Sequence, residues 1–210
     1  MEAGKWNWDK ESTLIFGESG SAHSEKVASF DMDDTLIKVK SGAKFPKDAN
    51  DWLFWDKSVP DKLRELEKDG FKLVIFTNQN GISLGKTSAS DIQTKIQNIC
   101  KEVGVQMTVF IASADDEYRK PSTRMWEILE SKHNGGVKID KKKSFFCGDA
   151  AGRKTARHKD FSDTDLKFAV NCDVPFKTPE VLFLNEKEET IEIKGFNPKT
   201  VATDGELVEG

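Results

Sequence analysis

The sequence predicts an α/β protein in which a Rossmann-like parallel sheet lies between two layers of helices. Short apolar runs alternate with helical patterns along most of the chain, and polar residues directly follow several of these runs. The composition agrees, because 37% hydrophobic and 32% charged residues over 210 positions are typical of a globular domain. Ligands of such sheets bind at the carboxyl ends of the strands.

The first half of the chain supplies two strands and a helix between them. Residues 27–30 and 72–76 are mostly apolar and end at polar side chains, as buried parallel strands do. Residues 60–68 place leucines on one face, and a glycine shortly afterwards is a natural helix stop. Residues 38–56 interrupt the alternation with several aromatics, and we expect them to form a short insertion, or minimal cap, beside the first strand.

The second half repeats this pattern. Residues 90–102 carry isoleucines at helical spacing and precede an apolar strand at 107–111. Residues 121–132 are expected to form a helix with a proline in its first turn, followed by a strand at 144–147. A last short strand is expected at 168–171. Strands and helices therefore alternate as in βαβ units.

Residues 1–185 are expected to form the domain, and residues 186–210, acidic and then glycine-rich, a linker or tail. No apolar run approaches the roughly 20 residues of a membrane-spanning helix, so no membrane association is expected. Three cysteines without paired spacing indicate a reducing compartment, and without a secretory signal nucleus and cytosol remain. At a net charge of -4, nucleic-acid binding would need a local basic patch such as residues 153–159.

The sharpest chemical signal is an acidic cluster after the first predicted strand. Asp31, Asp33 and Asp34 directly follow residues 27–30. Three carboxylates at one strand end repel one another, and a divalent cation such as Mg²⁺ usually stabilises such an arrangement. An ordinary acidic turn is the alternative for this cluster taken alone.

Polar residues also follow the other predicted strands. Thr77 and Asn78 follow the second strand, Lys120 comes after the third strand and its loop, and Gly148 and Asp149 follow the fourth. Individually these residues suit a strand cap, a surface lysine and a helix N-cap. Together, at successive strand ends of one sheet, they favour a catalytic site.

In this order the motifs resemble the haloacid dehalogenase superfamily, which has a DxDxT strand end, a Thr or Ser, a Lys and an acidic GD. The resemblance implies that Asp31 attacks phosphorus and forms an aspartyl phosphate, while Asp33 serves as general acid and base. It also implies that Thr77 and Lys120 hold the phosphoryl oxygens. The implied Mg²⁺ ligands are Asp31, the backbone carbonyl of Asp33, and Asp149.

Longer strings, "KLVIFTNQNGI", "YRKPSTRMW", "GDAAGR" and "KDFSDTDLKFAVN", resemble the 3'-phosphatase domain of the polynucleotide kinase/phosphatase family. This resemblance implies a nuclear DNA-repair enzyme that acts on DNA ends bearing a 3'-phosphate and meets repair scaffold proteins. Asp34 stands where that family commonly has glycine, which leaves substrate details open. The implied substrate contacts are Asn78, Arg119 and Arg153, with Asp163 or Asp165 positioning the metal or its ligands.

Aromatic residues of the 38–56 insertion have two interpretations. They either pack on the sheet or form a rim on which a terminal base stacks, as aromatic side chains do when they hold single strands without reading sequence. Phe45 and Trp52 are the candidates for stacking.

Two further strings concern a kinase activity. "GISLGKTS" resembles a nucleotide-binding P-loop, but only three residues separate Gly81 from Gly85 where that motif needs four. No kinase reaction is therefore expected of this chain. "GFNPKTV" at 195–201 resembles the linker that precedes the kinase domain in bifunctional members, which would place such a domain after it in a longer protein.

Two other functions compete with a DNA 3'-phosphatase. One is a small-molecule phosphomonoesterase acting on a sugar or histidinol phosphate, and the other is a catalytically idle binding module. The presence of both Asp31 and Asp33 argues against an idle module. The short insertion argues for an open cleft, which suits the end of a polymer better than a small substrate.

Overall fold

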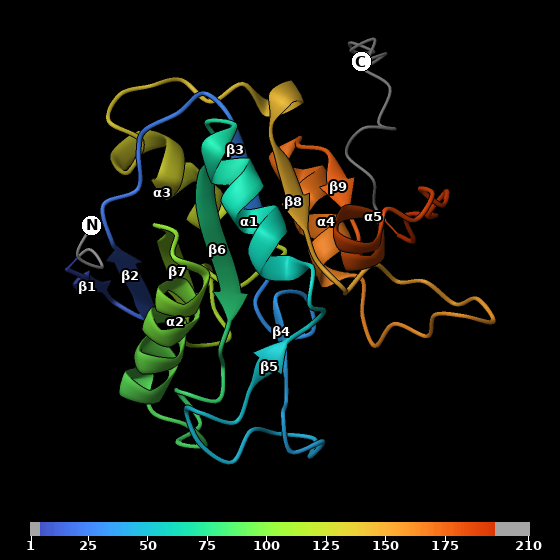
Figure 1. Ribbon diagram of the computed structural model, residues 1–210, viewed down its shortest axis with the longest axis horizontal. Helices are drawn as coiled ribbons and strands as arrows, with labels where there is room; N and C mark the ends of the chain where they lie inside the picture. Colours follow the sequence, from blue (N-terminus) through green and yellow to red (C-terminus); the bar gives the residue numbers. More distant parts are fainter. Residues whose placement is uncertain (1–4, 196–210) are drawn as a thin grey trace, which may run out of the picture.

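A seven-stranded sheet forms the centre of the molecule in the computed structural model, which describes residues 5–195 (Figure 1). The strand order is β1-β2-β7-β6-β3-β8-β9. The parallel strands are β3 (Val27–Phe30), β6 (Lys72–Asn78), β7 (Thr108–Ala112), β8 (Phe145–Cys147) and β9 (Phe176–Lys177). Because β3 lies between β6 and β8, residues that follow these three strands come together at one edge of the sheet.

The sheet is mixed, because an antiparallel hairpin extends one side of it. β1 (Asn7–Glu11) pairs with β2 (Leu14–Glu18), and β2 runs antiparallel to β7. Neither strand was predicted from the sequence. β1 is an edge strand exposed along nearly all of its length, so it lacks the apolar pattern that would have marked it.

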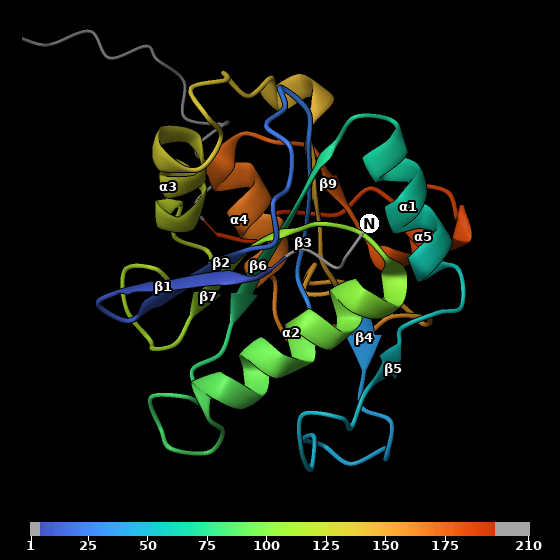
Figure 2. The same cartoon turned by 60° about the vertical axis from the view of Figure 1, so that its left-hand side comes forward.

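Helices cover both faces of the sheet (Figures 1 and 2). One face packs against α1 (Val59–Lys68), α2 (Ala89–Val103) and α5 (Pro179–Leu184). The other packs against α3 (Arg124–Lys132) and α4 (Thr164–Cys172). Alternate side chains of one strand serve the two cores: Ile75 joins the first and Phe76 the second. This confirms the predicted three-layer α/β fold.

The predicted strand at 168–171 is wrong, because these residues lie in α4. Leu166, Ala169 and Cys172 are buried at three-residue spacing, which puts them on the inner face of a helix. The aromatic ring of Phe168 packs edge-on against Phe146 of the sheet, with 4.9 Å between ring centroids. The helix predicted for 121–132 begins later, at Arg124, after a turn.

The insertion that follows β3 is small and mostly exposed. Its base is a two-stranded sheet of β4 (Ile37–Lys38) and β5 (Leu53–Phe54). The buried carboxylate of Asp51 closes the intervening loop, accepting hydrogen bonds from the Ser41 amide and hydroxyl, both at 2.7 Å, and from the Lys47 amide at 2.9 Å. The insertion projects beyond the carboxyl ends of the strands (Figure 1). The cap is therefore minimal.

The two strings that concern a kinase activity follow β6 and α5 in the sequence. The P-loop-like string forms a turn between β6 and α2, in which the Lys86 amide donates to the Gly81 carbonyl at 2.8 Å. α5 ends at Leu184, and the string at 195–201 lies almost entirely outside the described residues. Among residues 5–195, no helix is both long and apolar enough to cross a membrane.

Candidate active site

Three carboxylates meet at the carboxyl edge of the sheet. Asp31 directly follows β3, Asp149 follows β8, and Asp165 lies in the first turn of α4. One oxygen atom of each lies within 4.8 Å of the others. The Asp31 amide donates to the Cys147 carbonyl at 2.9 Å, which joins the ends of the two central strands. We call these three residues the carboxylate cluster.

Lys120 supplies the positive charge of this cluster. Its Nζ donates to Asp31 Oδ1 at 2.9 Å and to Asp165 Oδ1 at 2.8 Å, and the residue is only 2% exposed. Asn78 holds the Lys120 backbone, donating from Nδ2 to the carbonyl at 3.2 Å and accepting at Oδ1 from the amide at 3.0 Å. Asn78 was predicted to contact substrate. Its side chain instead clamps the loop that carries Lys120.

Asp33 and Thr77 are joined through a residue that the sequence analysis missed. Gln79 Nε2 donates to Asp33 Oδ2 at 2.8 Å and to Thr77 Oγ1 at 2.9 Å. The Asp33 carboxylate therefore turns toward the end of β6 and is not part of the carboxylate cluster. Its predicted part in metal binding concerned only the backbone carbonyl. Gln79 carried no sequence signal beyond its place beside the predicted site.

Thr35 and Gly148 determine the positions of Asp149 and Asp165. The Thr35 hydroxyl donates to Asp149 Oδ1 at 3.2 Å and accepts from the Asp149 amide at 3.1 Å. A Cβ atom at Gly148 would lie 2.4 Å from Asp165 Oδ2, so only glycine lets α4 approach this closely. The final threonine of the DxDxT pattern and the glycine of the GD pair are thus positioning residues.

The backbone conformation at Asp34 explains why the family commonly has glycine at this position. Its φ is +56°, in the left-handed region that glycine adopts most easily and that Asp and Asn tolerate better than most residues. The Asp34 amide donates to the Ile37 carbonyl at 2.7 Å in the turn that follows the acidic motif. The turn accounts for glycine at this position in the family that the sequence resembles.

The electrostatics of the cluster are strongly perturbed. Burial, together with the charges of Asp31 and Asp165, raises the pKa of Asp149 to about 9. Burial also raises the pKa of Asp165 to about 6, although Lys120 opposes the shift, and it raises the pKa of Asp31 in the same way. Burial alone would lower the pKa of Lys120, but Asp165 and Asp31 raise it. The cluster thus has one ammonium group for three carboxyl groups.

A further cation acts on Asp33 from α2. Desolvation by surrounding atoms raises the pKa of Asp33, whereas the Gln79 hydrogen bond and the charge of Lys95 lower it. Lys95 is 3% exposed, and the sequence analysis did not select it. A carboxyl group with a raised pKa in this position is suited to donating a proton.

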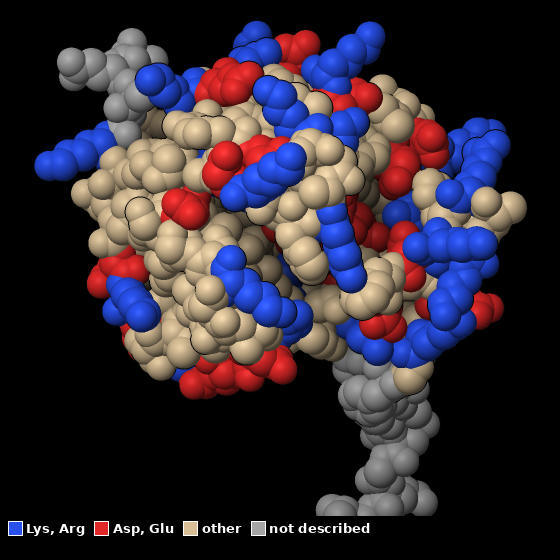
Figure 3. Space-filling model, turned by 90° about the horizontal axis from the view of Figure 1, so that it is seen from below, with Lys and Arg blue, Asp and Glu red and all other residues tan. Residues whose placement is uncertain are grey.

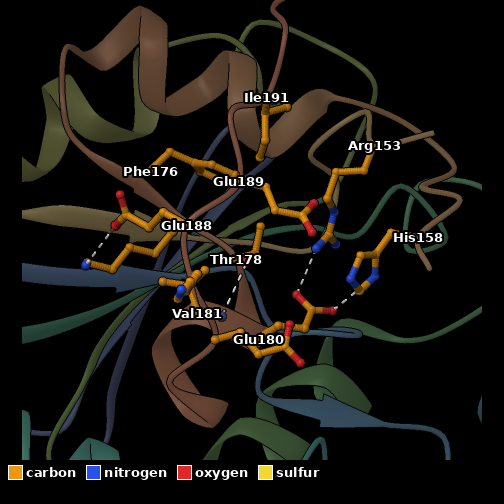
Figure 4. A pocket seen from close by; sticks show the side chains of 12 residues that line it. Arg153, His158, Phe176, Thr178, Glu180, Val181, Glu188, Glu189 and Ile191 are labelled. Atoms are coloured by element: carbon orange, nitrogen blue, oxygen red, sulfur yellow. Dashed lines mark hydrogen bonds and ion pairs between the residues drawn. The ribbon is translucent and has the colours of Figure 1, made fainter. Parts of the chain in front are cut away.

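Two of the predicted charged residues form ion pairs with carboxylates outside the carboxylate cluster. The Arg153 guanidinium is buried and donates to Asp160 at 2.8 and 3.1 Å. It also donates to Glu180 at 2.9 Å, so most of its donors are committed to these two carboxylates (Figure 4). Arg119 forms an ion pair with Asp115 at 3.5 Å.

Asp163, Phe45 and Trp52 are the remaining site residues predicted from the sequence. Asp163 pairs with Lys167 at 2.9 Å, so of Asp163 and Asp165 only Asp165 reaches the cluster. Phe45 is 69% exposed. Trp52 is half-buried, and its ring packs edge-on to Phe54, with 5.2 Å between centroids.

Aspartates at adjacent strand ends, a buried lysine and a threonine on an α/β sheet define a phosphohydrolase of the haloacid dehalogenase type. A solved structure of this class, the D,D-heptose bisphosphate phosphatase of B. bronchiseptica with magnesium and phosphate, has the same fold (TM-score 0.57, 16% identity, 72% of this chain and 78% of that chain). The family model "Polynucleotide kinase 3 phosphatase" matches residues 26–183. The chain therefore belongs to the polynucleotide kinase 3 phosphatase family.

Two curated relatives are similar over most of the chain. The bifunctional polynucleotide phosphatase/kinase of Schizosaccharomyces pombe is 38% identical over 91% of this chain, which spans 46% of that protein. The polynucleotide 3'-phosphatase of Saccharomyces cerevisiae is 32% identical over 77% of this chain and 88% of its own length. The chain thus corresponds to about half of the bifunctional relative and to most of the shorter one.

Proposed function

We propose that the protein is a polynucleotide 3'-phosphatase that removes the 3'-phosphate from DNA strand-break ends. The observation that carries this proposal is the position of Asp31, at the end of the central strand and in contact with Lys120 within the carboxylate cluster. Membership of a family whose Saccharomyces cerevisiae relative bears this name supports the choice of substrate. The mostly exposed insertion leaves the edge of the sheet accessible to a polymer end.

The residues suggest a two-step reaction. In the first step an Asp31 carboxylate oxygen forms a bond to phosphorus, the bond from phosphorus to the 3'-oxygen breaks, and Asp33 gives its proton to that oxygen. In the second step Asp33 takes a proton from water, which attacks phosphorus and releases Asp31 and inorganic phosphate. Lys120 and Thr77 hold the phosphoryl oxygens, and Gln79 fixes the positions of the Thr77 and Asp33 side chains through its two hydrogen bonds.

The cluster also fits a Mg²⁺ ion. Its donors are carboxylate oxygens, which Mg²⁺ prefers, and three carboxylates against one lysine leave an excess of negative charge. Asp31 and Asp149 would hold the ion, with Asp165 beside them. A bound Mg²⁺ would neutralise charge on the phosphoryl group and on the carboxylates.

We predict that Mg²⁺ stabilises the protein more at high pH than at low pH. The folded-state pKa values of Asp149, about 9, and Asp165, about 6, exceed the ordinary 3.8, so the folded protein binds more protons than the unfolded chain. The stability contributed by these groups is complete below about pH 4 and is lost as pH rises through 6 and 9. Thermal unfolding at pH 6 and 8.5, in chelator or in Mg²⁺, measures the effect.

The increase in melting temperature that Mg²⁺ causes is expected to be a few degrees larger at pH 8.5 than at pH 6. For a domain of this size, roughly 2–4 °C corresponds to 1 kcal/mol. Asp149→Asn removes a group whose pKa is raised to about 9. Its melting temperature in chelator should therefore fall less between the two pH values than that of the parent. Parallel curves for variant and parent would contradict this assignment.

The substrate is tested by phosphate release from a 3'-phosphorylated oligonucleotide, compared with a panel of sugar phosphates and histidinol phosphate, each with and without Mg²⁺. We expect the oligonucleotide to have the highest kcat/KM and to depend on Mg²⁺. Equal or better turnover of the small molecules would assign the chain to small-molecule phosphomonoesterases instead. Absence of turnover with every substrate would support the idle binding module.

We further propose that the protein acts in the nucleus, in DNA repair, where DNA strand breaks arise. Repair scaffold proteins are the partners this role implies, and a kinase domain would accompany the phosphatase if the full protein resembles its bifunctional relatives. Imaging of the tagged full-length protein in its own cells tests the location, and exclusion from the nucleus would contradict it.

A further inference from the structure

A short basic hairpin projects from the edge of the sheet beside the carboxylate cluster. Residues 154–159 fold back on themselves: Lys154 and Lys159 form an antiparallel bridge, and the Thr155 amide donates to the His158 carbonyl at 2.8 Å. Lys154, Arg157 and Lys159 are exposed. In the view onto this edge, Lys and Arg gather along the right-hand rim, and acidic atoms are visible in the central hollow (Figure 3).

The base of this hairpin is fixed to the active site. Buried Arg153 binds Glu180 of α5 (Figure 4). It also binds Asp160, which follows the hairpin, and its Nη2 donates to the Asp149 carbonyl at 3.4 Å. Asp160 also accepts from the Ala151 amide at 3.2 Å. The basic hairpin is therefore held at a set position relative to a residue of the carboxylate cluster.

A fully exposed aromatic residue follows the hairpin. Phe161 is 106% exposed, the highest value among the large hydrophobic residues exposed in the described part of the chain. The insertion offers a second such residue, Phe45, whose ring lies 5.5 Å from Lys44 Nζ. The insertion and the hairpin project at separate positions from the same edge of the sheet (Figure 1). Each projection thus combines an aromatic ring with basic side chains.

Basic side chains interleaved with exposed rings are suited to nucleic acid, because cations bind the phosphates and rings stack on bases of any sequence. A single strand leaving the carboxylate cluster can follow one of the two projections. In a duplex, the two strands can each contact one of them. The carboxylate cluster lies beside the base of the hairpin, so the second strand would pass close to the reacting end.

We propose that the basic hairpin and Phe161 hold the strand opposite the break in duplex DNA, the hairpin on its phosphates and Phe161 on a base exposed at a gap. This inference rests on the proposed function and adds to it a preference for gapped over single-stranded substrate. The insertion, with Phe45, then faces the strand whose 3'-phosphate is removed.

The test compares one 3'-phosphorylated oligonucleotide, free or annealed in a one-nucleotide gap. For the triple variant Lys154→Ala, Arg157→Ala, Lys159→Ala we expect the ratio of kcat/KM for gapped over single-stranded substrate to fall about tenfold. For Phe161→Ala we expect the ratio to fall roughly fivefold, the order of one lost stacking contact. The salt dependence of binding to gapped DNA should weaken in the triple variant only.

The matched control removes three lysines at the opposite end of the sheet, Lys138→Ala, Lys141→Ala and Lys142→Ala, and should leave the ratio unchanged. All substituted side chains are exposed or half-buried, and thermal unfolding verifies that each variant folds. Equal loss on both substrates, or loss on neither, would overturn the inference while leaving a DNA phosphatase. Turnover of small phosphates without turnover of DNA would instead overturn the proposed function.

Discussion

Replacing Asp31 by asparagine is expected to lower kcat by roughly 10⁴-fold or more. The change keeps the size of the side chain but removes the carboxylate oxygen that attacks phosphorus. It also removes the charge that pairs with Lys120 at 2.9 Å, so the attacking group and its partner are lost together. Phosphate release from the 3'-phosphorylated oligonucleotide, at saturating substrate and Mg²⁺, measures the loss.

Asp34→Asn is the matched control for this variant. It makes the same chemical change three residues further along, at an exposed position whose left-handed backbone asparagine also adopts. Its turnover should stay within about threefold of the parent, the range of a screened neighbouring charge. If Asp31→Asn retained turnover, with its mass confirming that no deamidation had occurred, Asp31 would not be the nucleophile.

Replacing Lys120 by methionine should have the second largest effect, on both activity and stability. Turnover is expected to fall by roughly 10³-fold, because the cation that holds the phosphoryl oxygens is lost. In chelator the free energy of unfolding is expected to fall by about 3–5 kcal/mol, since removing one partner leaves the buried charges of Asp31 and Asp165 without a cation. Kinetics and denaturant unfolding measure the two losses separately.

The control for this second variant is Lys138→Met, at an exposed site remote from the cluster, which should change stability by less than about 0.5 kcal/mol. Mg²⁺ should restore part of the stability of Lys120→Met, because a divalent cation compensates the same carboxylates. An unfolding free energy within 1 kcal/mol of the parent in chelator would show that Lys120 does not neutralise the cluster.

Local patterns predicted most of the elements but not all of them. The helices at 60–68 and 90–102 were predicted within a residue of their ends, because a leucine or isoleucine stripe at helical spacing has only one interpretation. The run at 168–171 was assigned to a strand because three apolar residues before Asn171 fit a buried strand or helix equally well. Burial at 166, 169 and 172 decided for the helix. β1 escaped because its pairing with β2, and not an apolar pattern, makes it a strand.

For the site, the sequence by itself determined the kinds of groups and their order along the chain. Asp31 and Asp33 were expected to follow one strand, Asp149 another and Lys120 the loop after a third, because hydrophobic runs place the residues after them at a sheet edge. These are local properties of short segments. Together with the resemblance to a known family, they indicated the class of protein.

Only the tertiary structure decided which of these groups meet. Asp165 joins the cluster and Asp163 does not, Arg153 turns to Asp160, and Gln79 links Asp33 with Thr77. Contacts between residues far apart in sequence depend on strand order and on how closely a helix packs. No single segment of the chain determines either property.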